Sequence, residues 1–230
     1  MKFKLFPKRS GGGNWEDRVS FAVESLSPGQ IITPNCAEIL DYASLLEGEI
    51  LDVGFANWTN SLYLAQLGNA ITGVDVSKRG IRSFMYNAKK MGVDHRINPI
   101  QADACRVFDG KLRDAQFDGA ISDRTLHTLP VQDRAEVIKN IQDHTKPGGL
   151  NIIAGLSQSD PNFRGRSSNL MTEEEMRRLY AGWEIIKCKD EVLKPEATHT
   201  HEDGTVHKEH SRVILVAKKT RRLNVSSTNK

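Results

Sequence analysis

The fold of this chain is decided by one stretch, Glu49-Ile-Leu-Asp-Val-Gly-Phe-Ala-Asn-Trp-Thr-Asn-Ser-Leu-Tyr-Leu-Ala65. An apolar run ends in Asp52-Val53-Gly54, a short loop follows, and an amphipathic segment then begins. This pattern is typical of a buried strand that turns sharply into a helix. Such a turn points backbone N–H groups and a helix N-terminus at the carboxyl edge of a sheet, where nucleotide-like ligands bind in open α/β folds.

On both sides of this stretch, apolar periodicity and turn residues predict further strands and helices. The predicted strands cover residues 49–53, 70–76, 97–101, 117–122, 150–155, 183–188 and 212–217. The predicted helices cover residues 14–26, 33–46, 61–67, 77–91, 130–145 and 172–180, the last opened by a capping box at Thr172. A polar loop is expected at 156–171, with Arg164 and Arg166 as possible contacts for an anion or as solvated side chains.

The stretch from Glu49 resembles motif I of class I S-adenosylmethionine-dependent methyltransferases, whose pattern is Asp/Glu-x-Gly-x-Gly-x-Gly. Residues 60–65 and 179–184 resemble the tellurite-resistance branch of that family. The resemblance covers residues 30–218. It implies an α/β, Rossmann-like fold with a seven-stranded mixed sheet flanked by helices and a C-terminal antiparallel hairpin. It also implies S-adenosylmethionine as cofactor, a small-molecule acceptor, and an N-terminal region that packs over the cofactor.

The glycine motif departs from the family pattern at two of its three glycine positions. Gly54 holds the first position, but Ala56 and Trp58 hold the second and third. Glycine is used in such loops because it permits positive φ and a close approach of backbone to ligand. The Trp58 ring either turns outward or fills the space of the methionine moiety. The alternative function is therefore an inactive methyltransferase fold that has lost the donor and acts as a binding or regulatory module.

The resemblance implies cofactor contacts at the carboxyl ends of the first four strands. Asp75 ends the second strand, 23 residues after Asp52, where an acid accepts hydrogen bonds from ribose hydroxyls; the alternative is an acid that favours the following helix N-terminus. Asp103 corresponds to an acid that binds the adenine amino group, and it can also cap a helical turn. The expected cofactor set is Asp52, Gly54, Ala56, Asp75, Val76, Asp103, Ala104 and Asp123.

The expected acceptor contacts follow the fourth strand and lie in the C-terminal hairpin. Residues 123–130 resemble the family's segment beside the transferred methyl group, which makes Asp123, Arg124 and His127 candidates; a solvated loop would carry the same residues. A hydroxyl or amine acceptor needs a proton acceptor, and a cation would hold an oxyanion. The expected catalytic set is His127, His199, His201 and Arg212.

Four of the seven histidines lie between residues 199 and 210, around the hairpin signal Asp203-Gly204. A two-residue turn there predicts the cross-strand pairs Glu202–Thr205, His201–Val206 and His199–Lys208. That register places His199, His201 and His210 on one face and His207 on the other. Three histidines on one face can hold a transition metal, but the pattern fixes no carboxylate to orient them. We predict no metal site, and an exposed polar hairpin is the other interpretation.

Composition predicts one soluble domain. At 230 residues, with 38% hydrophobic and 27% charged residues, the chain is ordinary for a globular protein. No apolar run is long enough to span a bilayer, and the first residues lack the pattern of a signal peptide. The three cysteines are far apart in sequence, which argues against a disulfide framework or a cysteine zinc site and favours the reducing cytoplasm.

The net charge of +3 conceals two basic ends. Residues 1–9 carry four basic side chains and residues 217–230 carry five; without these nine of the 32, the body has 23 basic and 29 acidic residues, a net charge of −6. An acidic body argues against nucleic acid as a partner beyond the basic ends. The expected layout is a flexible lead at 1–13, a methyltransferase domain at 14–218 and a basic tail at 219–230; the sequence predicts no oligomeric state.

Overall fold

The structure is a computed structural model that describes residues 30–55, 59–161, 169–193, 199–200, 206–207 and 210–221, with only the backbone described at 199–200 and 206–207. The predicted lead at 1–13, the predicted helix at 14–26 and most of the basic tail therefore lie outside the described residues. In the parts that are described, no helix combines the length and apolar character needed to cross a bilayer.

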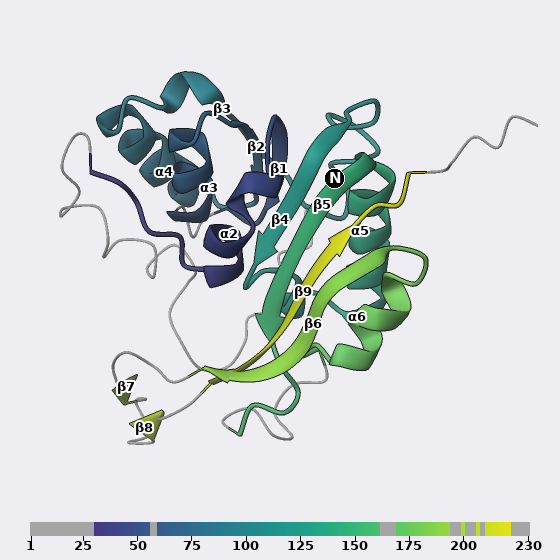
Figure 1. The fold of residues 1–230 in the computed structure, drawn as a ribbon. Coiled ribbons are helices and arrows are strands. Elements are labelled where there is room, and N and C mark those ends of the chain that lie inside the picture. The colour runs from purple at the N-terminus through teal and green to yellow at the C-terminus, as the bar shows by residue number, and fades with distance from the viewer. Residues whose placement is uncertain are drawn as a thin grey trace, which may run out of the picture.

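A seven-stranded sheet forms the centre of the molecule, with strand order β3-β2-β1-β4-β5-β9-β6 (Figure 1). Strands β1 to β5 are parallel to one another, whereas β9 is antiparallel to both β5 and β6. The expected seven-stranded mixed sheet is confirmed. The strands are β1 (Glu49–Val53), β2 (Ala70–Asp75), β3 (Ile97–Gln101), β4 (Phe117–Asp123), β5 (Thr145–Leu156), β6 (Glu184–Leu193) and β9 (His210–Lys218).

Helices cover both faces of this sheet (Figure 1). One face carries α2 (Ala37–Asp41), α3 (Thr59–Gln66) and α4 (Lys78–Lys90), and the other carries α5 (Val131–Asp143) and α6 (Glu173–Leu179). Among the described residues, three short 3-10 helices lie in the connections: η2 (Ala43–Leu45), η3 (Asp94–Arg96) and η4 (Leu126–Thr128). Successive strand residues point to opposite faces, so Ile50 and Ile152 lie in one core while Leu51 and Ile153 lie in the other.

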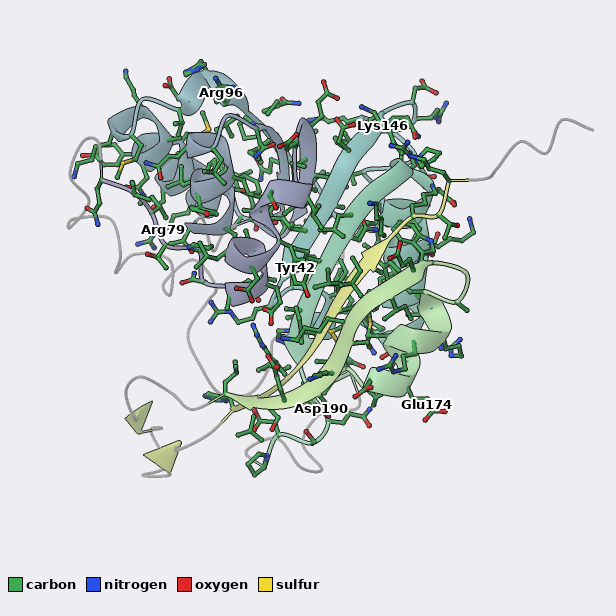
Figure 2. All side chains as sticks on the ribbon, in the orientation of Figure 1. Tyr42, Arg79, Arg96, Lys146, Glu174 and Asp190 are labelled. Carbon is green, nitrogen blue, oxygen red and sulfur yellow. The ribbon has the colours of Figure 1, made fainter. Side chains whose placement is uncertain are left out.

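The strand order places a topological switch point between β1 and β4. From β1 the chain moves outward to β2 and β3, and it then returns to β4 on the other side of β1. In open α/β folds the connections on the two sides diverge at such a point, and the crevice where ligands bind lies there, outside the carboxyl ends of the strands. Lys146 at the start of β5 and Asp190 near the end of β6 mark opposite ends of the sheet in Figure 2; the carboxyl edge lies at the Asp190 end.

The segment before β1 differs from the predicted helix at 33–46. Only Ala37–Asp41 is α-helical, followed by η2. The preceding residues do not join the helix because side chains of α3 bind their backbone: Ile32 N donates to Gln66 Oε1 at 2.9 Å and Cys36 N donates to Asn60 Oδ1 at 3.1 Å. Tertiary hydrogen bonds have replaced the first turn that the sequence predicts.

Strands β5 and β6 are the most extended relative to the prediction, and β4 and β9 are longer by one and three residues. Strand β5 begins at Thr145, because the chain pairs with Phe117 before a register shift and turns through Gly148 at φ 87°. Residues 146–149 therefore lie within the strand rather than between helix and strand. Strand β6 continues to Leu193 because β9 pairs with it along its whole length.

The register of the histidine hairpin was predicted wrongly. Strands β7 (His199–Thr200) and β8 (Val206–His207) form a separate two-stranded sheet in which His199 pairs with His207 and Thr200 with Val206. The observed pairs are shifted by one residue from the predicted pairs, and a one-residue change in register alters which residues face each other across a hairpin. His201 lies outside the described residues, so the predicted grouping of His199 with His201 and His210 stays a prediction.

A buried ion pair joins α5 to α6. Thr172 caps α6 as predicted, since its Oγ1 accepts from Glu175 N at 3.1 Å. The Glu175 side chain turns instead to the fully buried Arg134, which donates to both carboxylate oxygens at 2.8–3.0 Å and also donates to Asn169 O. Only half of the predicted capping box forms, because Arg134 needs a buried anion.

Removing Glu175 is expected to lower the free energy of unfolding sharply. Glu175→Ala leaves the Arg134 guanidinium buried without its carboxylate, which costs about 3–5 kcal/mol. The neighbouring Glu174 is exposed, and Glu174→Ala should change stability by less than about 0.5 kcal/mol. Urea denaturation of both variants measures the difference. Equal effects would show that Glu175 acts through helix charge alone.

Candidate functional site

Gly54 makes the turn that opens the crevice at the end of β1. It has φ 84°, and a Cβ there would lie 1.9 Å from Thr125 Oγ1. Gly54 N donates to Val74 O at 2.7 Å, and Thr125 Oγ1 donates to Gly54 O at 3.3 Å. One residue thus joins the ends of β1 and β2 to the turn after β4, and only glycine fits both the conformation and the space.

Asp52 lies beneath this turn as a buried acid. Its side chain is 4% exposed, and Ser61 Oγ of α3 donates to its Oδ2 at 2.6 Å. Burial, together with the charges of Asp123 and Asp75, raises the pKa of Asp52 to about 7 despite the lowering effect of the Ser61 hydrogen bond. The three acids therefore lie close enough to interact, and an arriving cation would relieve their repulsion.

Asp123 ends β4 directly beside the crevice. Its side chain is 9% exposed, and it accepts from Asn60 Nδ2 at 3.3 Å with Arg124 Nε at 3.6 Å. Burial raises its pKa, and the charge of Arg124 only partly offsets this. Arg124 has φ 55°, a left-handed conformation that non-glycine residues seldom adopt. Its guanidinium side chain, 54% exposed, is a cation at the mouth of the crevice.

Asp75 and Asp103 take the positions predicted for them at the ends of β2 and β3. Asp75 Oδ1 accepts from Ser77 N at 2.8 Å, and Asp103 Oδ1 accepts from Cys105 N at 2.9 Å. Ala102 N donates to Asp75 O at 3.0 Å, so the two strand ends adjoin. Both carboxylates therefore stabilise the turn that follows their strand by accepting a backbone hydrogen bond. Their binding of ribose and adenine stays a prediction. Val76 is exposed and Ala104 half-buried beside them.

His127 differs from the solvated-loop interpretation of its sequence context. It lies on η4, only 9% exposed, and packs against Gly155 of β5. A solvated loop would leave it open to water. Its ring is instead enclosed close to the end of β4, so it adjoins the crevice from inside the protein.

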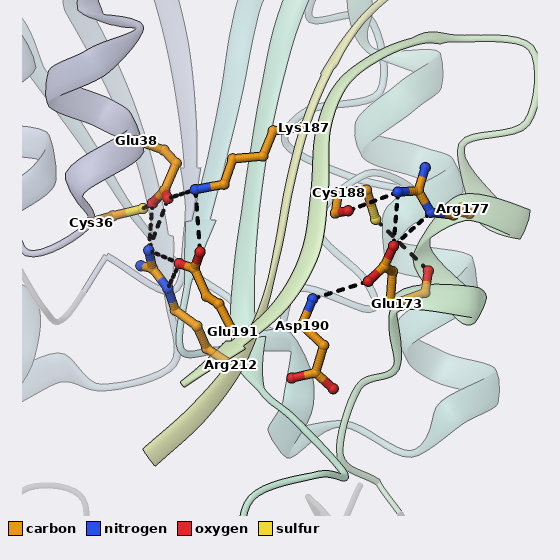
Figure 3. Close-up of polar contacts among 9 residues, drawn as sticks. All are labelled: Cys36, Glu38, Glu173, Arg177, Lys187, Cys188, Asp190, Glu191 and Arg212. Carbon is orange, nitrogen blue, oxygen red and sulfur yellow. Dashed lines mark hydrogen bonds and ion pairs between the residues drawn. The ribbon is translucent and has the colours of Figure 1, made fainter. Parts of the chain in front are cut away.

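Arg212 is bound to carboxylates beneath α2 (Figure 3). Its Nη2 donates to both oxygens of Glu38 at 2.9 Å and to Glu191 Oε1 at 2.6 Å. Lys187 Nζ donates to Glu38 Oε1 at 2.6 Å. Burial would raise the pKa of Glu38, but Lys187 and Arg212 together hold it below its ordinary value. Arg212 interacts electrostatically with Asp123, which places this cluster beside the crevice.

Several predicted site residues lie outside what the structure describes: Ala56, Trp58, His201, Arg164, Arg166 and the side chain of His199. Within the described ranges, no group of three His, Cys, Asp or Glu side chains is placed to hold a metal ion.

Sequence reasoning missed three residues of the site. Asn60 and Ser61 begin α3 and bond to Asp123 and Asp52, and their place directly after the glycine loop was the signal that could have found them. Glu38 offered no such signal. Its partners Lys187 and Arg212 lie 149 and 174 residues away in sequence, and no local pattern links them.

The sequence and the fold both match those of known proteins. A family profile described as tellurite resistance protein TehB matches residues 26–214. The chain belongs to the TehB family. The crystal structure of TehB from Haemophilus influenzae superposes with a TM-score of 0.68 at 22% identity, covering 80% of this chain and 62% of that one. The resemblance of residues 49–65 to class I methyltransferases is thereby confirmed.

Individual relatives of this TehB family member are distant. A protein named probable S-adenosyl-L-methionine-dependent methyltransferase TehB, from Haemophilus influenzae strain 10810, is 26% identical over 184 residues, covering 79% of this chain and 62% of that protein. Hemagglutinin 1 of Eikenella corrodens is 28% identical over 149 residues, covering 64% and 48%. The chain therefore spans about half to three-fifths of the length of these curated relatives.

A third similarity concerns a solved complex. The N-methyltransferase NodS from Bradyrhizobium japonicum, solved with S-adenosyl-L-homocysteine, has a TM-score of 0.59 at 17% identity and covers 80% of this chain and 84% of that one. This likeness concerns the fold.

Gly54→Ala is expected to destabilise the protein more than Gly68→Ala. Gly68 has φ 101° but nothing lies within 4 Å of a Cβ there, so that variant measures the conformational penalty alone, about 1–2 kcal/mol. Gly54→Ala adds the collision with Thr125. Chemical denaturation measures both free energies of unfolding. Equal losses would mean that the Thr125 turn moves aside freely.

Proposed function

We propose that this chain is an S-adenosyl-L-methionine-dependent methyltransferase that acts on a small-molecule acceptor. The observation that carries the proposal is the set of interacting acids Asp52, Asp75 and Asp123 at the switch point of the sheet. The donor carries a sulfonium and an ammonium group, and buried carboxylates that repel one another bind a cation favourably. The names of relatives support the reaction type.

Each part of the donor has a matching group at the edge of the sheet. Asp52 and Asp123 suit the cationic methionine moiety, and Asp75 suits the ribose hydroxyls at the end of β2. Asp103, with Val76 and Ala104 beside it, suits the adenine ring and its amino group. Gly54 lets the backbone at the end of β1 approach the donor closely, and the family resemblance assigns Ala56 to the same contact.

The chemical step needs little from the protein beyond positioning. The sulfonium is already an activated methyl donor, so the protein aligns the acceptor for in-line displacement and excludes water. The methyl carbon forms a bond to the acceptor, the carbon–sulfur electron pair stays on sulfur, and S-adenosylhomocysteine leaves. For a hydroxyl or amine acceptor, His127, His199 or His201 would take the proton.

A small acceptor fits the charge distribution and the relatives. Among the matched relatives are a thiopurine S-methyltransferase of Aliivibrio salmonicida and a 2-heptyl-1-hydroxyquinolin-4(1H)-one methyltransferase of Mycobacteroides abscessus. Arg124 at the crevice mouth would hold an anionic acceptor. The thiols of Cys36, Cys105 and Cys188 are unpaired, which suits a reducing cytoplasm.

Calorimetric titration with S-adenosylmethionine and S-adenosylhomocysteine tests the proposal. We expect micromolar dissociation constants. Asp75→Asn keeps an oxygen for Ser77 N but removes the charge, and should weaken binding about tenfold to a hundredfold, as the loss of charged hydrogen bonds does. Asp114→Asn, at an exposed position, is the matched control. Absence of binding by the folded protein would favour the inactive binding module that Ala56 and Trp58 suggest.

Donor affinity is expected to fall as pH falls through about 7. Asp52 has its pKa raised to about 7, so it is ionised above this pH and protonated below it. Because a cationic ligand binds the ionised form, the apparent dissociation constant should rise by up to about tenfold per pH unit below 7. Titration between pH 5.5 and 8, with Asp52→Asn as the comparison, measures this. A slope that persists in Asp52→Asn would assign it to a histidine.

A further inference from the structure

The segment at residues 30–41, which we name the N-terminal strap, runs along α3 from its last residue, Gln66, to its first turn beside the crevice. At one end Gln66 binds it twice, through Ile32 N at 2.9 Å and Gln30 O at 2.7 Å. In its middle, Asn35 N donates to Thr59 Oγ1 at 3.2 Å. The strap thus depends on hydrogen bonds to side chains of α3 for much of its docking, although Ile32 and Ile39 are buried in the core.

The other end of the strap is held by ions. Glu38 is 2% exposed and lies between Lys187 of β6 and Arg212 of β9 (Figure 3). Glu191 accepts from Arg212 at 2.6 Å and lies 3.4 Å from Lys187. The two cations and two carboxylates balance, and a buried carboxylate in this setting is hard to remove without its partners. We call these four residues the Glu38 clasp.

Asn60 lies between the strap and the crevice. Its side chain is 3% exposed; its Oδ1 accepts from Cys36 N at 3.1 Å and its Nδ2 donates to Asp123 Oδ2 at 3.3 Å. The amide offers an acceptor oxygen to a backbone N–H and a donor nitrogen to a carboxylate at once. The same side chain therefore contacts the strap on one side and a proposed donor contact on the other.

We propose that Asn60 is a positioning residue that couples the docking of the N-terminal strap to the orientation of Asp123. The Glu38 clasp anchors the end of the strap, so Lys187 and Arg212 act on the site through the strap rather than by holding the acceptor. The link to donor binding rests on the proposed function, whereas the anchoring of the strap by Asn60 rests only on the hydrogen bond from Cys36 N.

Coupling of this kind has a direct consequence for the ligand. A cation that draws Asp123 into a fixed orientation also fixes the Asn60 amide, and the amide then holds Cys36 N in place. Donor binding should therefore make strap opening rarer, and a change at Asn60 should remove that effect even where the ligand still binds.

Cys36 supplies the measurement. Cys36 belongs to the strap and is 1% exposed, so its thiol is buried while the strap is docked, whereas Cys188 on β6 is 3% exposed and donates to Glu173 O at 3.8 Å. The purified full chain is treated with iodoacetamide, and the alkylation rate of each cysteine is followed by mass spectrometry. Cys36 reports strap opening, and Cys188 reports opening of the sheet as a whole.

Four variants separate the parts. Asn60→Ala loses both bonds and should speed Cys36 alkylation about tenfold, as expected for one lost buried hydrogen bond to the strap, with Cys188 unchanged. Asn60→Asp keeps an acceptor for Cys36 N but sets a carboxylate against Asp123, so it should speed Cys36 alkylation by less than Asn60→Ala does. Lys187→Met weakens the clasp and should also speed Cys36 alkylation. Asn98→Ala, at an exposed position on β3, should change neither rate.

Saturating S-adenosylhomocysteine should slow Cys36 alkylation in wild type and in Lys187→Met, but not in Asn60→Asp. Calorimetry verifies the occupancy of each protein.

Three results would overturn the proposal. The first is a Cys36 rate in Asn60→Ala within about twofold of wild type, and the second is equal acceleration of Cys36 and Cys188. The third is full ligand-dependent slowing in Asn60→Asp. If Asn60→Ala does not fold, Asn60→Asp and Lys187→Met still decide. Absence of ligand binding in wild type would refute the proposed function, and the rates without ligand would then decide the anchoring of the strap.

Discussion

Two carboxylates buried close together at the ends of β1 and β4 constrain everything around them. Asp52 and Asp123 cannot both be ionised there without compensation. Hydrogen bonds from the hydroxyl of Ser61 to Asp52 and from the amide of Asn60 to Asp123 stabilise the two carboxylates, and both donors lie in the first turn of α3. The position of α3 is thereby fixed relative to both strands, and so is the path of the strap that runs along it.

The fold could be predicted from sequence because its determinants are local and repeated. Apolar runs that end in polar or glycine residues located each strand of the main sheet, and periodicity located α3, α4 and α5. The errors arose where distant groups decide local structure. Side chains of α3 hold residues 32–36 out of a helix, and the register of β7 and β8 depends on a loop that Asp203-Gly204 alone does not define.

The candidate site was predictable only where its residues are marked by local sequence patterns. Acids at strand ends could be found because a strand end is visible in the sequence, and Asp52, Asp75, Asp103 and Asp123 all lie at the carboxyl edge. The packing and hydrogen bonds around these acids could not be predicted from the sequence. Burial of His127 against Gly155 and capture of Arg212 by Glu38 depend on packing between segments far apart in the chain.

The Glu38 clasp also limits how the sequence can change over time. The four residues of the clasp lie on three different elements, yet their two positive and two negative charges balance in one largely buried place. Loss of Glu38 alone would leave two cations with Glu191, and loss of either cation would leave an anion poorly solvated. Substitutions at these positions are therefore tolerated as joint replacements, and related chains should carry either the whole charged set or an apolar set in its place.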